Sequence, residues 1–343
     1  MLKPPTRILI LGATGHIGQA VTRHALKKGL QVTALSRRDR PEGLLDLNIN
    51  LVRIDSSLRS LSDVAAGHDL LVDAAAPYPL SSGVPGSQSW RSQVDSAVER
   101  MELVIDAARR NNMRLAYISS CTTLPRQESP QRAAAAIWRR SVSPYFEAKA
   151  AMEHAVLAAA RDGLPAVILN PAAFLGPWEY REVEGSFVRL VLEGRLQLVL
   201  DQIMCVIDVR DVAEAIDRAF ACEMYGRPIP LSGHNIGLPA LVMRTAKLAG
   251  MNSIPPFPLH PDMVSASAYW MQTMLKSIGS TAASALNFIP LIADVLPMQP
   301  SPELLELGVT IHPLDQTLRD SIAFHRQRRP APAHQSQAPH SAR

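Results

Sequence analysis

Short runs of β-branched and aliphatic residues alternate, in the first half of the chain, with longer segments whose apolar residues recur every three or four positions. The runs predict strands over Arg7–Leu11, Gln31–Leu35, Leu51–Ile54, Leu70–Ala74, Leu115–Ser119 and Ala166–Leu169. The longer segments predict helices, including Gly15–Lys28 and Trp90–Asn111. Strands that alternate with helices of this length predict an α/β fold with a doubly wound parallel sheet.

The pattern loosens after Pro171. A helix, a strand, a second helix and a short extended segment are predicted over 183–192, 203–207, 209–222 and 227–231. Residues 236–310 have a helical pattern interrupted by prolines, with little strand character. We therefore expect a main domain over residues 1–170, completed by 203–235, and a smaller, mostly helical lobe made of 171–202 and 236–325. Residues 326–343 hold few large apolar side chains and predict a disordered tail.

Composition is ordinary for a globular protein of 343 residues, with 47% apolar residues and a net charge of +4. Arginines of the last eighteen residues contribute to that charge, and no basic stripe with interleaved aromatics is present elsewhere, so a nucleic-acid partner is not expected. Cys121, Cys205 and Cys222 are odd in number and lack metal-type spacing. They predict neither a disulfide framework nor a metal site, and they favour a reducing cytoplasm.

Two apolar segments raise the question of a membrane. The run Ile8–Leu11 is too short for the core of a signal peptide and leads directly into a glycine turn, so it fits a first strand better. The segment Ala282–Met298 is interrupted by Asn287, Pro290 and Asp294. It is too short and too polar to span a bilayer, so stable membrane insertion is not expected.

A glycine-rich turn, Gly12-Ala13-Thr14-Gly15-His16-Ile17-Gly18, lies between the first strand and the first helix. Side chains at the three glycines would block a diphosphate or hold the helix away from the strand. The helix N-terminus offers N–H groups and a partial positive charge to the anion. The turn predicts a dinucleotide-binding domain; an ordinary βα turn is the alternative. The predicted contacts are Gly12, Thr14, Gly15, His16, Ile17 and Gly18.

The end of the second strand bears on which dinucleotide binds. An acidic residue there would accept hydrogen bonds from the ribose of NAD. Instead Arg37 and Arg38 follow Ser36, and guanidinium groups pair well with a 2′-phosphate, so NADP is expected and NAD is the alternative. Asp55, after the third strand, could accept from the adenine amino group or could cap the following helix. Ala74 and Ala75, after the fourth strand, leave space for a flat cofactor.

Tyr145 and Lys149 are four positions apart, so on a helix they share one face. A free phenol has a pKa of about 10 and exchanges protons poorly at neutral pH. A neighbouring ammonium favours the phenolate, which brings the group into a useful range. Lys149 could also reach the nicotinamide ribose. We predict Tyr145 as the acid/base of a hydride-transfer reaction, with Lys149 assisting it and contacting the cofactor.

A hydroxyl-rich strand end precedes this helix, in Ser119-Ser120-Cys121-Thr122. A hydroxyl there could bond the oxygen of a carbonyl or alcohol substrate. Ser120 is the predicted residue; Ser119 and Thr122 are alternatives, and an ordinary turn is the other interpretation.

With these motifs the chain resembles the extended short-chain dehydrogenases/reductases, the NAD-dependent epimerase/dehydratase superfamily, and within it the dihydroflavonol reductase and 3β-hydroxysteroid dehydrogenase branches. The resemblance runs from Ile8 to about His325. Besides the motifs above, it rests on Asn170-Pro171, Gly176-Pro177, Val206–Ala213, Leu307-Gly308, Pro313-Leu314 and Leu318–Ile322. It implies a Rossmann fold, tyrosine as acid/base, an assisting lysine, and a serine or threonine that orients the substrate.

The chain departs from the family pattern at two places. Asn170 stands where an arginine is usual, and Thr123-Leu124-Pro125 replaces a usual Val-Tyr-Gly. Some alignments of the family place the working hydroxyl at the position of Cys121. These departures weaken a nucleotide-sugar interpretation.

Aromatic residues are frequent in the loops expected to wall the substrate pocket and favour an apolar or aromatic small-molecule substrate; they are Tyr78, Trp138, Phe174, Trp178, Tyr180, Phe187, Tyr269 and Trp270. We therefore predict an NAD(P)-dependent oxidoreductase acting on a ketone or secondary alcohol. The alternatives are a sugar epimerase or dehydratase and a non-catalytic NADP-sensing protein. Helices around 90–111 and 144–162 could form the interface of a homodimer.

Overall fold

The computed structural model describes residues 5–75, 87–125, 144–180, 186–252, 255–259 and 295–328. Its centre is a seven-stranded parallel sheet with the strand order β10-β6-β5-β4-β1-β2-β3. Its strands are β1 (Arg7–Leu11), β2 (Gln31–Ser36), β3 (Asn50–Arg53), β4 (Leu70–Asp73), β5 (Arg114–Ile118), β6 (Ala166–Pro171) and β10 (Pro228–Leu231). The predicted doubly wound α/β fold is confirmed.

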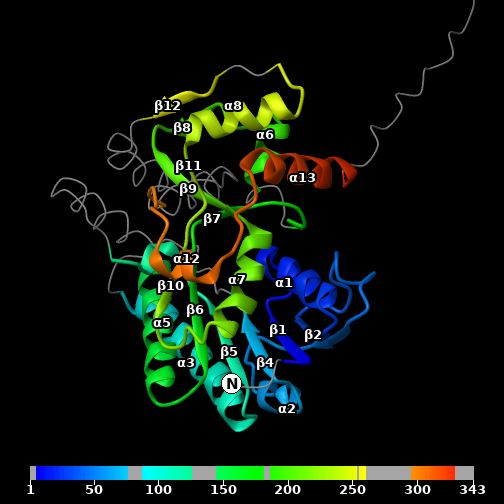
Figure 1. Cartoon of the computed structure of the whole chain (residues 1–343), viewed down its shortest axis with the longest axis vertical. Coiled ribbons are helices and arrows are strands. Elements are labelled where there is room, and N and C mark those ends of the chain that lie inside the picture. The colour runs from blue at the N-terminus through cyan, green and yellow to red at the C-terminus, as the bar shows by residue number, and fades with distance from the viewer. Residues whose placement is uncertain are drawn as a thin grey trace, which may run out of the picture.

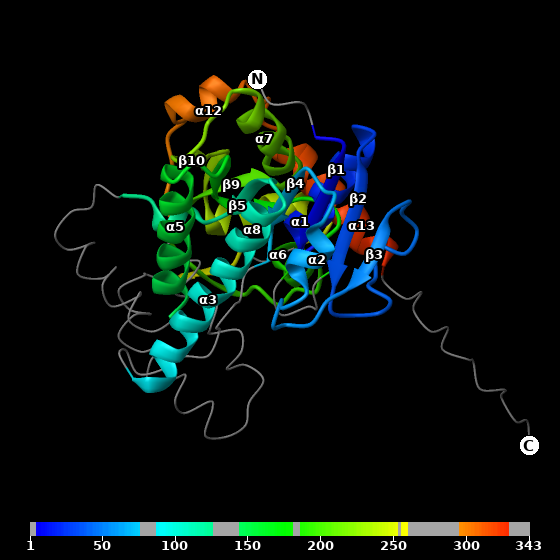
Figure 2. The same cartoon turned by 90° about the horizontal axis from the view of Figure 1, so that it is seen from below.

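Helices cover both faces of the sheet, as alternating apolar side chains require (Figures 1 and 2). On one face Ile8 and Ile10 pack with α1 (His16–Lys27) and α7 (Val209–Ala221). On the other face Leu9 and Leu11 pack with α2 (Leu61–Ala65), α3 (Gln88–Arg110) and α5 (Tyr145–Arg161).

The carboxyl ends of the strands point toward a second group of elements, at the top of Figure 1. It contains the sheet β11-β9-β7, the pair β12-β8 and several helices. Their bounds are β7 (Ala173–Leu175), α6 (Phe187–Leu192), β8 (Leu198–Leu200), β9 (Ile203–Asp208), β11 (His234–Gly237), α8 (Leu238–Leu248), β12 (Phe257–Leu259) and α13 (Leu314–Gln327). The helix α12 (Pro302–Leu307) lies lower, against β10 and α7. A 3-10 turn, η1 (Cys121–Thr123), follows β5.

β9 confirms the strand predicted over 203–207, whereas the short strands β7, β8, β11 and β12 were missed by the sequence analysis. β11 and β12 have only four and three residues, and no alternation of buried and exposed positions marks them. The helix predicted over 183–192 is present from Phe187 to Leu192, and residues 181–185 lie outside the described residues. α13 reaches Gln327, so the predicted start of the tail at residue 326 was too early. The boundaries predicted for domain and lobe stay predictions.

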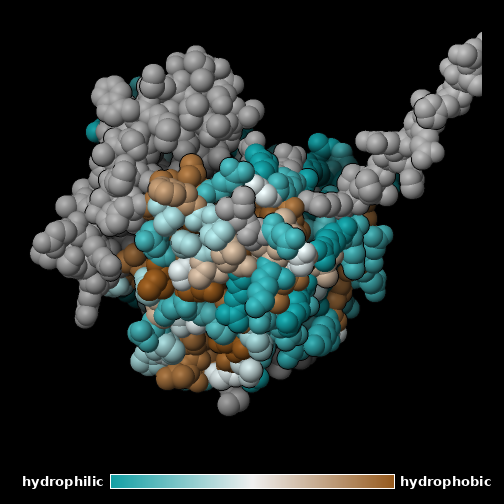
Figure 3. Space-filling view, turned by 90° about the horizontal axis from the view of Figure 1, so that it is seen from above, coloured by the Kyte–Doolittle hydropathy of each residue, from teal (hydrophilic) through white to brown (hydrophobic). Residues whose placement is uncertain are grey.

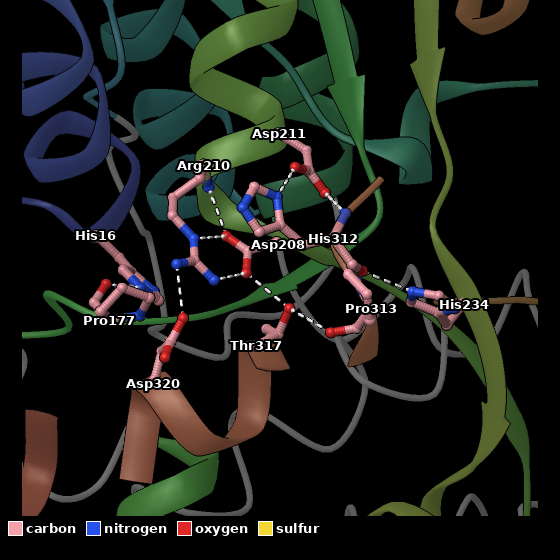
Figure 4. Close-up of polar contacts among 10 residues, drawn as sticks. All are labelled: His16, Pro177, Asp208, Arg210, Asp211, His234, His312, Pro313, Thr317 and Asp320. Carbon is pink, nitrogen blue, oxygen red and sulfur yellow. Dashed lines mark hydrogen bonds and ion pairs between the residues drawn. The ribbon is translucent and has the colours of Figure 1, made fainter. Parts of the chain in front are cut away.

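Polar contacts at the start of α7 join it to α13 (Figure 4). Asp208 caps α7 by accepting from the Arg210 backbone N–H at 2.8 Å, and it also accepts from the Thr317 hydroxyl at 2.6 Å. The Arg210 guanidinium binds Asp208 and, at 2.6 Å, Asp320 of α13. Burial alone would raise the pKa of Asp208, but the hydrogen bonds from Arg210 and Thr317 hold it below its usual value. These contacts therefore fix α13, the last helix, to the end of β9 and the start of α7.

Within the part of the chain that the structure describes, no helix has both the length and the apolar character needed to cross a bilayer. Seen from the lobe side, apolar residues form separate patches among hydrophilic ones (Figure 3). The large apolar side chains of β8, β9 and β12 that are exposed are Leu198, Ile203 and Phe257.

Candidate active site

A cavity of about 1220 Å³ lies between the sheet and the lobe. It exceeds the roughly 300–1,000 Å³ common for a single small-molecule site, so it has room for a cofactor and a substrate together. The predicted site residues that line it are Gly12, Thr14, Gly15, His16, Ile17, Arg37, Asp55, Ala74, Ala75, Ser120, Tyr145 and Lys149. Gly18 and Arg38 are not among the lining residues.

The glycine turn is closely packed. Gly12 has φ +83°, and a Cβ on it would lie 2.5 Å from the backbone nitrogen of Ala75. A Cβ on Gly18 would lie 2.1 Å from the carbonyl oxygen of Gly12, which explains why this glycine packs against the turn instead of lining the cavity. Gly15 is the N-cap of α1, and a side chain there would meet only the Gly12 oxygen, at 3.3 Å. A free helix N-terminus beside a cavity fits a diphosphate.

His16, a predicted cofactor contact, is held by contacts with other residues of the protein. Its side chain is buried, and its Nε2 donates a hydrogen bond to the Pro177 carbonyl oxygen at 2.9 Å (Figure 4). Its ring also packs edge-on against Phe174. These contacts tie the Gly176-Pro177 loop to the start of α1.

The opposite end of the cavity has exposed charged residues. Arg37 is exposed, and among the described residues its guanidinium has no hydrogen-bond or ion-pair partner. Asp55 accepts hydrogen bonds from the backbone and the hydroxyl of Ser57, at 2.9 and 2.6 Å, and these bonds lower its pKa. Asp55 therefore closes a local turn with Ser57 and lines the cavity; it does not cap a helix, because α2 begins at Leu61 with Ser60 as its N-cap.

Tyr145 and Lys149 lie one turn apart near the start of α5, and both are buried. The Lys149 ammonium donates to the Ile118 carbonyl oxygen at 2.9 Å and lies 3.5 Å from the Tyr117 hydroxyl. Burial lowers the pKa of Lys149 to about 8. The amine is therefore mostly charged at neutral pH and becomes neutral above that value.

Ser120 stands at the end of β5, as the N-cap of η1. Its Oγ accepts from the backbone nitrogen of Thr122 at 3.2 Å and from the Thr122 hydroxyl at 2.9 Å. This leaves the Ser120 O–H as a donor toward the cavity. Ser119 also lines the cavity, but its hydroxyl donates to the buried Glu153. All three candidate hydroxyls line the cavity, so the choice of Ser120 stays a prediction.

Three charged residues around this centre were missed by the sequence analysis. Glu153, one turn after Lys149, accepts from Thr123 Oγ1 at 2.7 Å and Asn170 Nδ2 at 2.8 Å. Asp73 and Arg100 form a buried ion pair beside Lys149. The sequence could have indicated Asp73, because a carboxylate directly after Leu70-Leu71-Val72 lies at the end of a buried strand and needs a partner there.

Apolar side chains line the lobe side of the cavity, including Leu175, Leu198, Val199, Leu200, Met204, Leu238 and Leu241. Of the aromatics predicted to wall the pocket, Phe174 and Phe187 line it. Trp178 instead packs under the Arg23 guanidinium, and Tyr180 packs against Phe324. Tyr78, Trp138, Tyr269 and Trp270 lie outside the described residues.

Comparison with known proteins decides the family. Residues 8–226, more than half of the chain, match the NAD dependent epimerase/dehydratase family. The chain belongs to that family. Membership makes it an NAD(P)-dependent oxidoreductase of the short-chain dehydrogenase/reductase type with a nicotinamide cofactor, as the sequence predicted. The glycine turn and the free helix N-terminus beside the cavity fit such a dinucleotide.

Relatives of this epimerase/dehydratase family member include proteins with reductase names. A Synechocystis protein provisionally named dihydroflavonol 4-reductase is 25% identical over 323 residues, covering 91% of this chain and 92% of its own. Sterol demethylase protein B of Methylococcus capsulatus is 30% identical and covers 63% of this chain and 68% of its own. The 2-alkyl-3-oxoalkanoate reductase of Stenotrophomonas maltophilia is 31% identical and covers 57% and 58%.

Solved structures share the fold. A nucleoside-diphosphate-sugar epimerase from Pseudomonas aeruginosa superposes with a TM-score of 0.71 at 20% identity, covering 94% of this chain and 98% of its own. The Bordetella bronchiseptica enzyme WbmH, in complex with NAD+, superposes with a TM-score of 0.67 at 21% identity, covering 94% and 99%. At these identities the likeness extends to the fold alone.

Asn170 makes several polar contacts beneath the site. Its Nδ2 donates to Glu153, Thr123 and the Ser120 carbonyl oxygen, and its Oδ1 accepts from the Ile229 backbone. The asparagine thus joins β6, β10, α5 and the turn that carries Ser120. It serves as a neutral partner of the Glu153 carboxylate at the position where the family usually has arginine.

Proposed function

We propose that this enzyme transfers a hydride between NADPH and a ketone or secondary alcohol whose body is apolar or aromatic. One observation carries the proposal: a single cavity joins the glycine turn and Arg37 to Tyr145, Lys149 and an apolar lobe. The names of the three relatives, two reductases and a sterol demethylase, agree with apolar substrates and redox chemistry. The proposed substrate is a small molecule, and cytoplasmic location stays a prediction.

Each site residue has its own role in the proposed reaction. The bound nicotinamide supplies or accepts the hydride at the substrate carbon. In the reducing direction Tyr145 gives its hydroxyl proton to the substrate oxygen. The positive charge of Lys149, one turn away, stabilises the phenolate that remains, and its ammonium would also hold the ribose. Ser120 donates a hydrogen bond to the same substrate oxygen as charge develops there.

A sugar epimerase or dehydratase remains the alternative activity, since structural neighbours include a nucleotide-sugar enzyme. The lining argues against it, because a sugar diphosphate calls for cations in the lobe. The segment 181–195 carries three arginines: Arg195 lines the cavity, whereas Arg189 pairs with Glu193 and Arg181 lies outside the described residues.

Absorbance of NADPH distinguishes the two activities. With a panel of aromatic, alicyclic and long-chain ketones, we expect net oxidation of NADPH by at least one class of ketone and none with nucleotide sugars. An epimerase returns its cofactor to the starting redox state in each cycle. The proposed activity would be refuted if a nucleotide sugar were converted without net consumption of NADPH and no ketone of the panel led to oxidation of NADPH.

Cofactor preference is proposed to depend on Arg37. The change Arg37→Ala removes a guanidinium that lines the cavity and has no partner among the described residues. It is expected to lower kcat/KM for NADPH by about 10- to 100-fold, with little change for NADH. Steady-state rates with both cofactors measure it. Arg38→Ala is the matched control, since Arg38 does not line the cavity and should change the preference less than threefold or so. A wild-type preference for NADH would contradict the assignment.

The sequence predicted that helices around 90–111 and 144–162, which are α3 and α5, form the interface of a homodimer. This interface stays a proposal. The two helices lie side by side on one face of the sheet, which makes them available as one continuous surface (Figure 1).

A further inference from the structure

A buried ion pair without a role in the proposed reaction lies next to Lys149. Asp73 ends β4 and is fully buried, and Arg100 of α3 retains 15% exposure and lines the cavity. The guanidinium binds both carboxylate oxygens, with Nη1–Oδ2 at 2.9 Å and Nη2–Oδ1 at 2.6 Å. Two parallel hydrogen bonds of this kind fix the relative orientation of both side chains.

The carboxylate of this pair also holds the turn after β4. The Ala75 backbone nitrogen donates to Asp73 Oδ1 at 3.1 Å. That nitrogen lies 2.5 Å from the position that a Cβ on Gly12 would take, so the Ala74–Ala75 turn and the glycine turn touch closely. Through one carboxylate, α3 is therefore linked to both backbone segments that border the cavity.

The same pair acts electrostatically on the ammonium of Lys149. The charged and titratable groups around that ammonium are Asp73 from β4, Arg100 from α3, Tyr117 from β5, and Tyr145 and Glu153 from its own helix. Burial lowers the pKa of Lys149 most strongly, and Arg100 lowers it further, whereas Asp73 and Glu153 raise it. The two members of the ion pair thus act on Lys149 with opposite signs.

We propose that Asp73 and Arg100 are positioning residues of the active site: their ion pair fixes the Ala74–Ala75 turn against the glycine turn and balances the charge around Lys149. The inference rests on the proposed function, in which Lys149 holds the cofactor. Neither side chain takes part in a chemical step. Asp73 favours the charged form of Lys149, and Arg100 offsets that effect while it holds the Asp73 carboxylate in place.

The pH dependence of NADPH binding tests this without relying on turnover. Fluorescence of NADPH gives its Kd across the alkaline range, and the wild-type affinity is expected to fall as Lys149 loses its proton, with an apparent pKa of about 8. We call the pH at which the affinity begins to fall the break. The Lys149→Ala variant should lose it. Arg100→Met should move the break up by on the order of one pH unit, and Asp73→Asn should move it down by a similar amount.

Further variants separate charge from geometry. Arg100→Lys keeps the charge, so the break should stay near its wild-type position, although loss of the second hydrogen bond should weaken NADPH binding by about threefold or more. The double variant Arg100→Met/Asp73→Asn removes both charges and should return the break toward the wild-type value. Arg110→Met and Asp106→Asn remove an exposed ion pair of the same helix and should leave the break in place.

Each outcome bears on one of the two proposals. A break that persists in Lys149→Ala would refute the role given to Lys149, and this inference with it. A break that disappears in Lys149→Ala but moves in the same direction, or not at all, in Arg100→Met and Asp73→Asn would overturn this inference alone. Should Arg100→Met fail to fold, the downward shift in Asp73→Asn and the unchanged break in Arg100→Lys decide the question together.

Discussion

Tyr145→Phe is expected to lower kcat by about 10²- to 10⁴-fold while leaving the Kd for NADPH within about twofold of wild type. The tyrosine ring is buried and packs edge-on against Phe146, with centroids 5.4 Å apart, and phenylalanine keeps that packing. The change therefore removes only the hydroxyl to which we assign the proton transfer. Single-turnover measurement of NADPH oxidation with a saturating ketone isolates the chemical step from binding and product release.

The matched control is Tyr225→Phe. Tyr225 packs against Phe220 at the far side of the sheet, and its hydroxyl is not part of the cavity lining, so this change should leave turnover unaltered. If Tyr145→Phe retained turnover within about tenfold of wild type, the proton would have to come from another group, and the acid/base role proposed for Tyr145 would be lost. A parallel loss of NADPH affinity would instead indicate that the hydroxyl shapes the cofactor site.

The central sheet was predictable because its inner strands are buried on both faces. The runs around Ile8–Leu11 and Ala166–Leu169 are continuous and aliphatic, and the helices between them carry a clear apolar stripe. The lobe gave no such signal. β8 and β12 pair through three residues each, and their formation depends on neighbours brought together by the fold instead of on local pattern.

Residues that line the cavity were predictable where a motif fixes backbone geometry, and they were missed where side chains find their partners across the fold. The glycine turn and the Tyr145–Lys149 pair have characteristic spacing, and both line the cavity. Arg100 lies in α3 beside the buried Ala97 and Met101, a position that predicts a buried partner but does not identify it. That partner, Asp73, is on another strand, so only the folded chain shows the pair.

Gly18→Ala is expected to destabilise the protein by about 3 kcal/mol or more and to abolish measurable NADPH binding. Its Cβ would stand 2.1 Å from the Gly12 oxygen and 2.7 Å from the Ala13 Cα, and both atoms belong to the backbone. Since no side chain can rotate away, α1 would have to move off β1. Gly12→Ala meets a similar obstacle, with a left-handed φ of +83° in addition. Thermal unfolding and NADPH fluorescence titration measure the two effects.

Gly15→Ala should separate binding from folding, because Gly15 borders the cavity and its Cβ would meet only one backbone atom, at 3.3 Å. We expect its melting temperature to stay near that of wild type while the Kd for NADPH rises by about tenfold or more, since the methyl group would occupy space needed by a diphosphate at the helix N-terminus. Gly237→Ala is the matched control: it is also a helix N-cap, with φ −63° and nothing within 4 Å of the added Cβ, and it should change neither quantity. Equal NADPH affinity in Gly15→Ala and Gly237→Ala would mean that the diphosphate does not bind at this turn. The cofactor would then have to approach the cavity from the lobe side, where the lining is apolar and offers a diphosphate little to bind.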